Sequence, residues 1–464
     1  MPPPLPHAPP APDALPFALV GPRVPARRAL PGRAAWPLWW VLLTALLAAG
    51  CGSESGAGGG GGASASSDAA QDASLDGSGS DDASSDASGV DATAADATAG
   101  EDAGADGDDG SATPATYAIG VATVEVASAG GRKLPVELWY PATPSPGADA
   151  AKYANGLASS PFGAVRDAKA LAGPWPLVMF SHGNGGIRDQ SVFLTEWLAR
   201  HGFVVASPEH VGNSIWSMDD KLGGVMPIWR PKDIKAVVDY LAKPDAKAPA
   251  WVAGLVKTET YAIMGHSFGG YTSLAIAGLR VGVPPAYKLD CDAADAPKEL
   301  CAEVATLGPD PWDLSDPRCV LAVPLAPAGY SFGMLPKIQA GQSFPPIVLM
   351  GATGDTLTPV ASEARAIYND LPGVAALWVL TGSNHYIFSD ICALSPVLPA
   401  DMKKQLGTMC NPDSQPPLEA VHADIADRAL AAARIWLRLE PAAIADLLAP
   451  TQSWAKIESK NVEE

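Results

Sequence analysis

The sequence YAIMGHSFGG, residues 261–270, is the part of the chain most informative about its fold. An apolar, strand-forming run leads into a serine flanked by small residues, Ser267, and a helix-forming run follows directly. This order is typical of a strand, a strained tight turn and a helix, in which the turn exposes the serine hydroxyl. The same Gly-x-Ser-x-Gly spacing surrounds Ser331, but Pro336 and no helix-forming run follow it. Ser267 is therefore the candidate nucleophile, and Ser331 is expected to lie in an ordinary glycine-rich turn.

Short apolar runs alternate with amphipathic segments on both sides of this turn. Such alternation predicts an α/β fold with a mostly parallel central sheet covered by helices on both faces. The expected strands are an antiparallel pair at 117–126 and 133–140, followed by 175–180, 203–207, 261–264, 319–325, 347–350 and 376–380. The expected helices are 189–200, 231–241, 270–279, 361–371 and 418–439.

Two loop-rich insertions, 211–229 and 280–317, interrupt this alternation. They carry Trp216, Trp229 and Trp312. Long loops in compact domains commonly serve as lids or binding loops, so we expect these insertions to form a cap and the walls of a substrate cleft.

A serine hydroxyl becomes a useful nucleophile only when a base takes its proton and a carboxylate orients that base. Of the seven histidines, His385 follows the last expected strand of the central series in a loop. Asp355 follows the strand expected at 347–350. The chain order Ser267, Asp355, His385 is the one typical of a serine on such a turn. These three residues are the candidate catalytic set.

Two backbone N–H groups are needed to stabilise the oxyanion that forms when serine attacks a carbonyl. The first expected donor is Phe268, directly after the candidate nucleophile. The second is expected in the glycine-rich turn SHGNGG, residues 181–186, at Asn184. No cluster of Cys and His has the spacing of a metal site.

Residues 176–214 and 261–270 resemble the platelet-activating factor acetylhydrolase and predicted dienelactone hydrolase branch of the α/β-hydrolase superfamily. Residues 347–371, IVLMGATGDTLTPVASEARAIYNDL, are similar to the same segment of bacterial cutinases and polyester hydrolases. The resemblance implies an α/β-hydrolase fold over about 117–439 and a serine esterase without a cofactor. It also implies Ser267 as nucleophile, His385 as base, and Phe268 and Asn184 as oxyanion donors.

The chain departs from these relatives at three points. No carboxylate stands near Ala328, where the acetylhydrolases carry their acid, so the cutinase position at Asp355 must serve. Polyester hydrolases carry a cleft-lining tryptophan where this chain has Ala328. True dienelactone hydrolases use cysteine as the nucleophile, whereas this chain has Ser267. The resemblance therefore specifies the reaction type more closely than the substrate.

The N-terminal region has the pattern of an export signal. Arginines precede an apolar run at 36–49, which is shorter than the roughly 20 residues of a membrane span, and Gly-Cys51 follows it. Residues 47–51, LAAGC, resemble a bacterial lipobox, in which Cys51 is lipidated. We expect a lipoprotein signal peptide at 1–50, placing the protein at a bacterial outer membrane or cell surface. Simple secretion or a periplasmic location, and a retained short anchor, remain alternatives.

Residues 51–115 consist largely of Gly, Ser, Ala, Asp and Thr and contain acids but no Lys or Arg. Such a segment is expected to be a disordered linker. The catalytic domain is then expected at 116–440 and a C-terminal tail at 441–464. The whole chain has a net charge of −19, and no basic stripe runs through it, which argues against nucleic acid as a partner.

Six cysteines are present, and Cys51 is assigned to lipid. Cys291 and Cys301 share one polar insertion, and Cys392 and Cys410 bracket the segment after the candidate base. We predict disulfides within these two pairs, typical of an oxidising compartment, with Cys319 as a buried thiol in a strand.

The sequence thus predicts a carboxylic-ester hydrolase that acts through an acyl-enzyme on short-chain esters, with a small-molecule or lipid ester as substrate. A phospholipid acyl hydrolase, a lipase and a polyester hydrolase are alternatives within the same chemistry. A non-catalytic surface-binding lipoprotein on the same scaffold is the alternative outside it, since a fold alone does not confer function.

Overall fold

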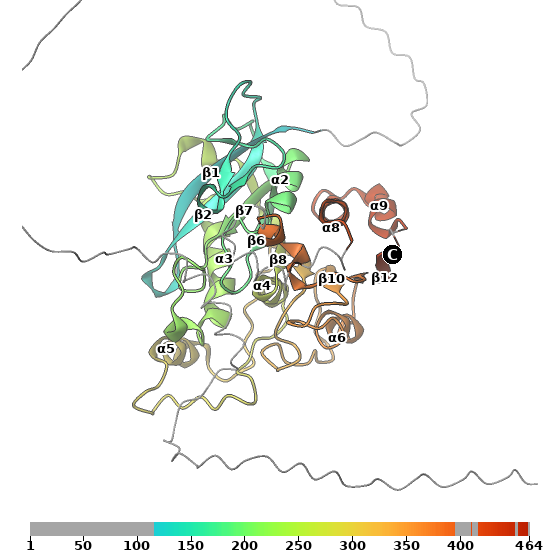
Figure 1. Cartoon of the computed structure of the whole chain (residues 1–464). Coiled ribbons are helices and arrows are strands. Elements are labelled where there is room, and N and C mark those ends of the chain that lie inside the picture. The colour runs from blue at the N-terminus through green and yellow to red at the C-terminus, as the bar shows by residue number, and fades with distance from the viewer. Residues whose placement is uncertain (1–115, 395–409, 411–415, 451–452, 463–464) are drawn as a thin grey trace, which may run out of the picture.

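The computed structural model describes residues 116–394, 410, 416–450 and 453–462. Within these residues, ten strands form one sheet in the order β12-β11-β10-β9-β8-β6-β7-β2-β1-β5 (Figure 1). The strands from β7 to β11 are parallel, whereas the β2–β1 hairpin and β12 pair antiparallel at opposite ends. The strand bounds are β1 Ala118–Ala127, β2 Lys133–Ala142, β5 Val165–Arg166, β6 Trp175–Ser181, β7 Val204–Pro208, β8 Val256–His266, β9 Cys319–Leu325, β10 Ile347–Ala352, β11 Ala375–Leu380 and β12 Ala455–Lys460.

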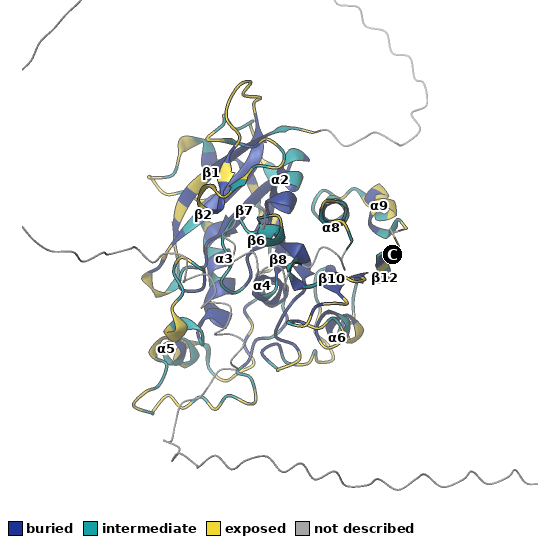
Figure 2. Cartoon of the chain, viewed as in Figure 1, coloured by how far each residue is buried: buried dark blue, intermediate teal, exposed yellow. Residues whose placement is uncertain are grey.

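Helices cover both faces of this sheet, and Figure 2 shows the central strands as its most buried part. Successive residues of a strand point to opposite faces, and β8 illustrates this directly. Tyr261 and Ile263 pack in the core beneath α3 and α4, while Ala262 and Met264 pack in the core beneath α2 and α8. The helix bounds are α2 Val192–Arg200, α3 Met226–Ala242, α4 Phe268–Ile276, α5 Lys298–Leu307, α6 Ala364–Asp370, α8 Leu418–Leu437 and α9 Ile444–Leu448.

Each strand and helix expected from the sequence is present, with shifted ends. Two elements begin five residues earlier than expected: β8 begins at Val256 and not at 261, and α3 begins at Met226 and not at 231. Pro227 occupies the first turn of this helix and Pro231 lies inside it. A proline fits the first helical turn best, so the sequence suggested Pro231 as the start, although Pro227 already fills that position.

The C-terminal segment is part of the fold, which corrects the expectation of a tail at 441–464. Helix α9 lies in it, and β12 pairs with β11 from Ala375–Lys460 to Leu380–Ala455. Strand β12 is a charged edge strand with few buried residues, so its sequence lacks the apolar alternation by which strands are recognised.

The two insertions do not enclose a cleft with their tryptophans, so that expectation is wrong for Trp229 and Trp312. Trp229 is buried in α3, where its Nε1 donates to Glu303 of α5 at 2.7 Å. Trp312 is buried and donates to the carbonyl of Gly308 at 2.8 Å. The second insertion follows α4 and packs its α5 against α3, so it forms part of a flank of the domain (Figure 1).

Both predicted disulfides are present, Cys291–Cys301 and Cys392–Cys410, and Cys319 is a buried free thiol. The signal peptide expected at 1–50, Cys51, and the linker at 51–115 lie outside the described residues. Among the residues that are described, no helix combines the length and apolar composition needed to cross a membrane.

Candidate active site

Ser267 occupies a strained turn between β8 and α4. Its backbone has φ 59° and ψ −115°, a conformation that costs roughly 1–3 kcal/mol for a residue other than glycine. The turn closes tightly, because a Cβ on Gly265 would lie 2.4 Å from the Gly269 carbonyl oxygen. A Cβ on Gly269 would lie 1.8 Å from the Ser181 carbonyl oxygen. Only glycine fits these positions, and the serine side chain is thereby held at the carboxyl end of the sheet.

Asp355 and His385 form a buried pair beside this turn. His385 Nδ1 donates to Asp355 Oδ2 at 2.7 Å, and the two residues are 5% and 4% exposed. The backbone N–H groups of Leu357 and Thr358 both donate to Asp355 Oδ1 at 2.8 Å, and the Thr358 hydroxyl also contacts Oδ2. With Nδ1 protonated, the Nε2 of a neutral His385 is left as the proton acceptor.

The surroundings of Asp355 keep it ionised. Burial acts to raise its pKa, but the hydrogen bond and charge of His385 and the two hydrogen bonds from Thr358 outweigh burial and hold the pKa below 3.8. An ionised Asp355 favours the His385 tautomer with its proton on Nδ1, and a carboxylate in this position can stabilise an imidazolium.

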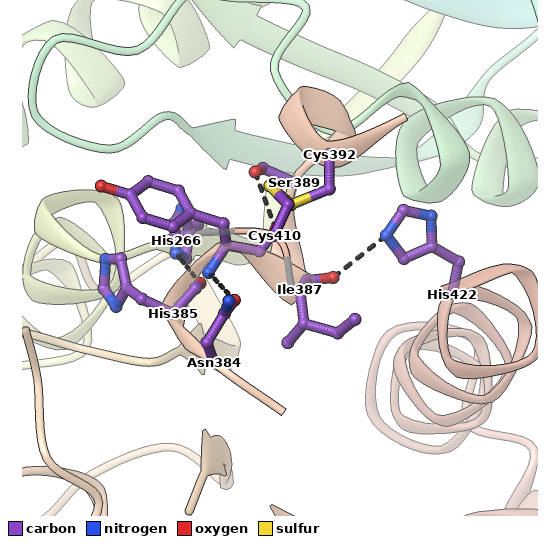
Figure 3. Close-up of a disulfide and its surroundings, with 9 residues drawn as sticks. His266, Asn384, His385, Ile387, Ser389, Cys392, Cys410 and His422 are labelled. Atoms are coloured by element: carbon purple, nitrogen blue, oxygen red, sulfur yellow. Dashed lines mark hydrogen bonds between the residues drawn. A yellow bond between two sulfur atoms is a disulfide. The ribbon is translucent and has the colours of Figure 1, made fainter. Parts of the chain in front are cut away.

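The three candidate catalytic residues follow β8, β10 and β11, which run parallel in one part of the sheet. Their loops therefore meet at the same sheet edge. Among the described residues, no hydrogen bond joins the Ser267 hydroxyl to His385. The link between the two loops is made one residue earlier, where His266 Nε2 donates to the carbonyl of His385 at 2.9 Å (Figure 3).

His266 is a member of the site that the sequence analysis left without a role. The Gln190 amide donates to His266 Nδ1 at 3.0 Å, and the same amide accepts from the Gly183 N–H at 2.9 Å. Nδ1 is thus the acceptor, which leaves the proton on Nε2 for His385. Burial keeps the pKa of His266 well below 6.5, so the ring is neutral. Its position next to the candidate nucleophile was the only signal in the sequence.

The turn expected to supply the second oxyanion donor lies against Ser267. A Cβ on Gly183 would lie 3.5 Å from Ser267 Cβ. The N–H groups of Gly183, Gly185 and Gly186 are all used by acceptors inside the protein. Among the described residues, the N–H of Asn184 has no such acceptor, so it is available to a substrate oxygen. The N–H of Phe268 begins helix α4, directly after the serine.

The second Gly-x-Ser-x-Gly match lies elsewhere in the fold. The Ser331 hydroxyl donates to Glu363, which also accepts the N–H groups of Tyr330 and Ser331. Ser331 therefore anchors a loop to the N-terminus of α6, as expected for a turn without chemistry.

A largely parallel sheet with helices on both faces, a serine on a strained strand-to-helix turn, and an Asp–His pair after later strands define the α/β-hydrolase fold. The chain has this fold, and its sequence has cutinase-like similarity.

Residues 157–219, which include the glycine-rich turn at 181–186, match the family described as Platelet-activating factor acetylhydrolase, isoform II. Cutinase 2 of Thermobifida cellulosilytica is 25% identical over 211 residues, 45% of this chain and 60% of the cutinase. Cutinase est1 of Thermobifida alba is 24% identical over 195 residues, 42% of this chain and 47% of that protein. The match thus spans about half of the length of these relatives.

Among solved structures, a ferulic acid esterase from Streptomyces cinnamoneus superposes with a TM-score of 0.51 at 21% identity. The superposition covers 75% of this chain and 98% of the esterase. At this level of identity the likeness concerns the fold.

Proposed function

We propose that the protein is a serine hydrolase of carboxylic esters that works through an acyl-enzyme and prefers short acyl groups. The observation that carries the proposal is the Asp355–His385 hydrogen bond, which leaves His385 Nε2 as a base at the sheet edge where Ser267 stands on its strained turn. The similarity to cutinases supports the same reaction class.

In the proposed mechanism, Ser267 Oγ attacks the ester carbonyl while His385 Nε2 takes the hydroxyl proton. Asp355 stabilises the resulting imidazolium. The carbonyl oxygen becomes an oxyanion and accepts hydrogen bonds from the N–H groups of Asn184 and Phe268. His385 then returns the proton to the leaving alcohol, and a water activated by His385 releases the acid from Ser267.

The preference for short acyl chains is supported by small side chains next to the nucleophile. The N–H of Ala328 donates to the Ser267 carbonyl at 3.3 Å, so an alanine and not a large aromatic residue lies beside the strained turn at Ser267. An acyl chain gains binding of roughly 0.8 kcal/mol for each buried CH₂, and alanine provides little apolar surface to bury it.

The experiment is a series of p-nitrophenyl esters from acetate to palmitate, with pre-steady-state kinetics on the purified full chain. A burst equal to the enzyme concentration and a maximum of kcat/KM between about two and six acyl carbons support the proposal. A rate that rises toward long chains or above the micelle concentration supports a lipase, and preference for acetylated phospholipid supports a phospholipid acyl hydrolase. Absence of any turnover, with no burst, supports the non-catalytic binder.

Polyester hydrolysis is a second candidate because of an exposed aromatic residue near the oxyanion turn. Trp216 is 53% exposed, and its neighbour Ile215 donates its N–H to the Gly186 carbonyl at 3.4 Å. An exposed indole offers a polymer chain a flat apolar surface. Substitution of Trp216 by alanine should then reduce release of products from a polyester film and leave p-nitrophenyl butyrate hydrolysis unchanged, whereas equal effects on both would contradict this candidate.

Export is part of the proposal, with Cys51 as a lipid-modified N-terminus. The two disulfides support an oxidising compartment. Expression of the full chain in a bacterial host with labelled palmitate should label the wild-type protein and leave a Cys51→Ser variant unlabelled. Equal labelling of both proteins would contradict lipidation at Cys51.

A further inference from the structure

Arg230 of α3 is fully buried, at 0% exposure, directly behind the candidate oxyanion hole. Within the part of the chain that the structure describes, its hydrogen bonds run to residues that shape that hole. Its NH2 group donates to the carbonyl oxygen of His182 and, at 3.1 Å, to the Ser181 hydroxyl. These contacts hold the start of the turn that contains Asn184.

The same guanidinium reaches Asn184 through Asn213. Arg230 NH1 donates to Asn213 Oδ1 at 2.7 Å, and Asn213 Nδ2 donates to Asn184 Oδ1 at 2.6 Å. The backbone carbonyl of Asn213 accepts the N–H of Gly185 at 3.2 Å. Asn213 therefore holds the turn at the Asn184 side chain and at the following N–H, while Arg230 holds it at His182, before the Asn184 amide. Together these contacts orient the Asn184 N–H, which has no acceptor among the described residues.

Arg230 also contacts the other half of the hole. Its Nε donates to the Thr272 hydroxyl at 3.1 Å, and that hydroxyl donates to the carbonyl of Phe268 at 2.9 Å. The guanidinium carbon lies 4.6 Å from the centre of the Phe268 ring, in a cation–π arrangement. One side chain thus touches the supports of both expected oxyanion donors.

The charge of Arg230 is not neutralised by an ion pair among the described residues. The nearest acid in sequence, Asp233, is bound by Arg132 at 2.6 Å and by His210 Nδ1 at 2.9 Å. Burial keeps the pKa of His210 well below 6.5, so His210 is neutral. Burial also lowers the pKa of Arg230 to about 9, which leaves it protonated at neutral pH. A net positive charge therefore lies behind the hole.

We propose that Arg230 is a positioning residue of the oxyanion hole. It holds the loops that carry the Asn184 and Phe268 N–H groups at a fixed separation, and its positive charge favours a negative oxygen between them. This inference rests on the proposed ester hydrolysis and names the residue that preorganises it. Buried, fully bonded polar networks of this kind are rigid, and fixed donors stabilise an oxyanion without reorganisation.

The test uses three variants of the full chain. Asn213→Ala breaks the connection from Arg230 to Asn184, and Thr272→Val breaks the connection from Arg230 to Phe268. Arg230→Met removes both connections together with the charge. For each, a phosphonate titrant counts active sites, and kcat, KM and the inhibition constant of an alkyl trifluoromethyl ketone are expressed per active site. The ketone forms a tetrahedral oxyanion adduct with a serine, so its affinity reports on the hole.

We expect kcat per site to fall about 10-fold in Asn213→Ala and in Thr272→Val and about 100-fold in Arg230→Met, with KM changed less than about threefold. The ketone should bind more weakly by the same factors. Arg428→Met is the matched control, because Arg428 is also buried and donates to the carbonyls of Asp446, Leu447 and Ala449 at 2.5–2.8 Å, away from the site. It should lower the melting temperature and leave the values per site unchanged.

Equal kcat and ketone affinity per site in wild type and in the Asn213→Ala and Thr272→Val variants would overturn the inference, even if Arg230→Met does not fold. The same holds if the losses lie only in the number of titratable sites, because that pattern indicates a structural role. Failure of the proposed function is distinct from both results, since the wild-type protein would then show no burst and no phosphonate labelling of Ser267.

Discussion

His266 donates a hydrogen bond from Nε2 to the backbone carbonyl of His385, with 2.9 Å between the two atoms. The residue before the candidate nucleophile thereby holds the loop that carries the candidate base. Figure 3 shows this bond together with the Cys392–Cys410 disulfide further along the same loop. Gln190 selects the required tautomer by donating to Nδ1 of the same ring.

Replacing His266 by leucine should lower kcat by about 10- to 100-fold with little change in KM, because a base displaced by a fraction of an ångström loses its alignment with the hydroxyl. His266→Gln should recover most of this loss, since its amide can donate to the His385 carbonyl. The control is His201→Leu, because the His201 ring bonds to the backbone carbonyl of Trp197 in α2 and packs against the Trp197 ring, without contact to His385. Equal activity of the leucine and glutamine variants at position 266 would contradict the positioning role.

Ser267→Ala should abolish the burst and reduce ester hydrolysis to the background rate while the melting temperature stays near that of wild type. Ser331→Ala should keep kcat unchanged and cost only some stability, since the Ser331 hydroxyl bonds to Glu363. Steady-state assays and thermal unfolding measure both. Turnover by the Ser267→Ala protein close to the wild-type rate would rule out the assigned nucleophile.

Asp355→Asn should lower kcat steeply, by up to about 10⁴-fold, because an asparagine amide in this place favours the wrong tautomer of His385. KM should change far less, since Asp355 is buried behind the imidazole. The measurement is kcat and KM with a short-chain ester. A loss of less than tenfold would point to a different acid.

Acid stability should depend on the same carboxylate. Its pKa is lowered in the folded state, so Asp355 contributes stability that is present above the unfolded value of about 3.9 and is lost as pH falls through the folded value. Between about pH 5 and pH 3, the free energy of unfolding should fall more in wild type than in Asp355→Asn. Denaturant titrations at several pH values measure this, and parallel curves would contradict the prediction.

The Cys392–Cys410 disulfide should support activity as well as stability. It closes a loop of 18 residues, for which chain entropy predicts about 3 kcal/mol of stabilisation, and Cys392 lies close in sequence to His385. A Cys392→Ala/Cys410→Ala double variant should therefore unfold at a lower temperature and show a lower kcat. The matched Cys291→Ala/Cys301→Ala variant should lose stability only, because that disulfide ties α5 to the preceding part of the insertion. Equal kcat values in the two double variants would contradict a role in holding the base.

Local sequence patterns were sufficient for the fold class and the central strands and helices, and they nominated the candidate catalytic set, but they missed α5, α9 and the edge strand β12. The alternation of residues along a strand and the glycines around Ser267 are patterns among residues adjacent in the chain. They can therefore be recognised without the structure. The two disulfide pairs were equally accessible, because each joins cysteines that are close in sequence.

The polar residues that support the candidate catalytic set can be recognised only in the folded protein. In the sequence, Arg230 is an ordinary helical arginine and His266 a histidine in a turn, and their roles come from contacts with residues such as Asn213 and His385 that are distant along the chain or on other elements. The same reason explains the errors at Trp229 and Trp312. An indole in an insertion packs in a core as readily as in a cleft, and the choice depends on long-range packing that no local pattern records.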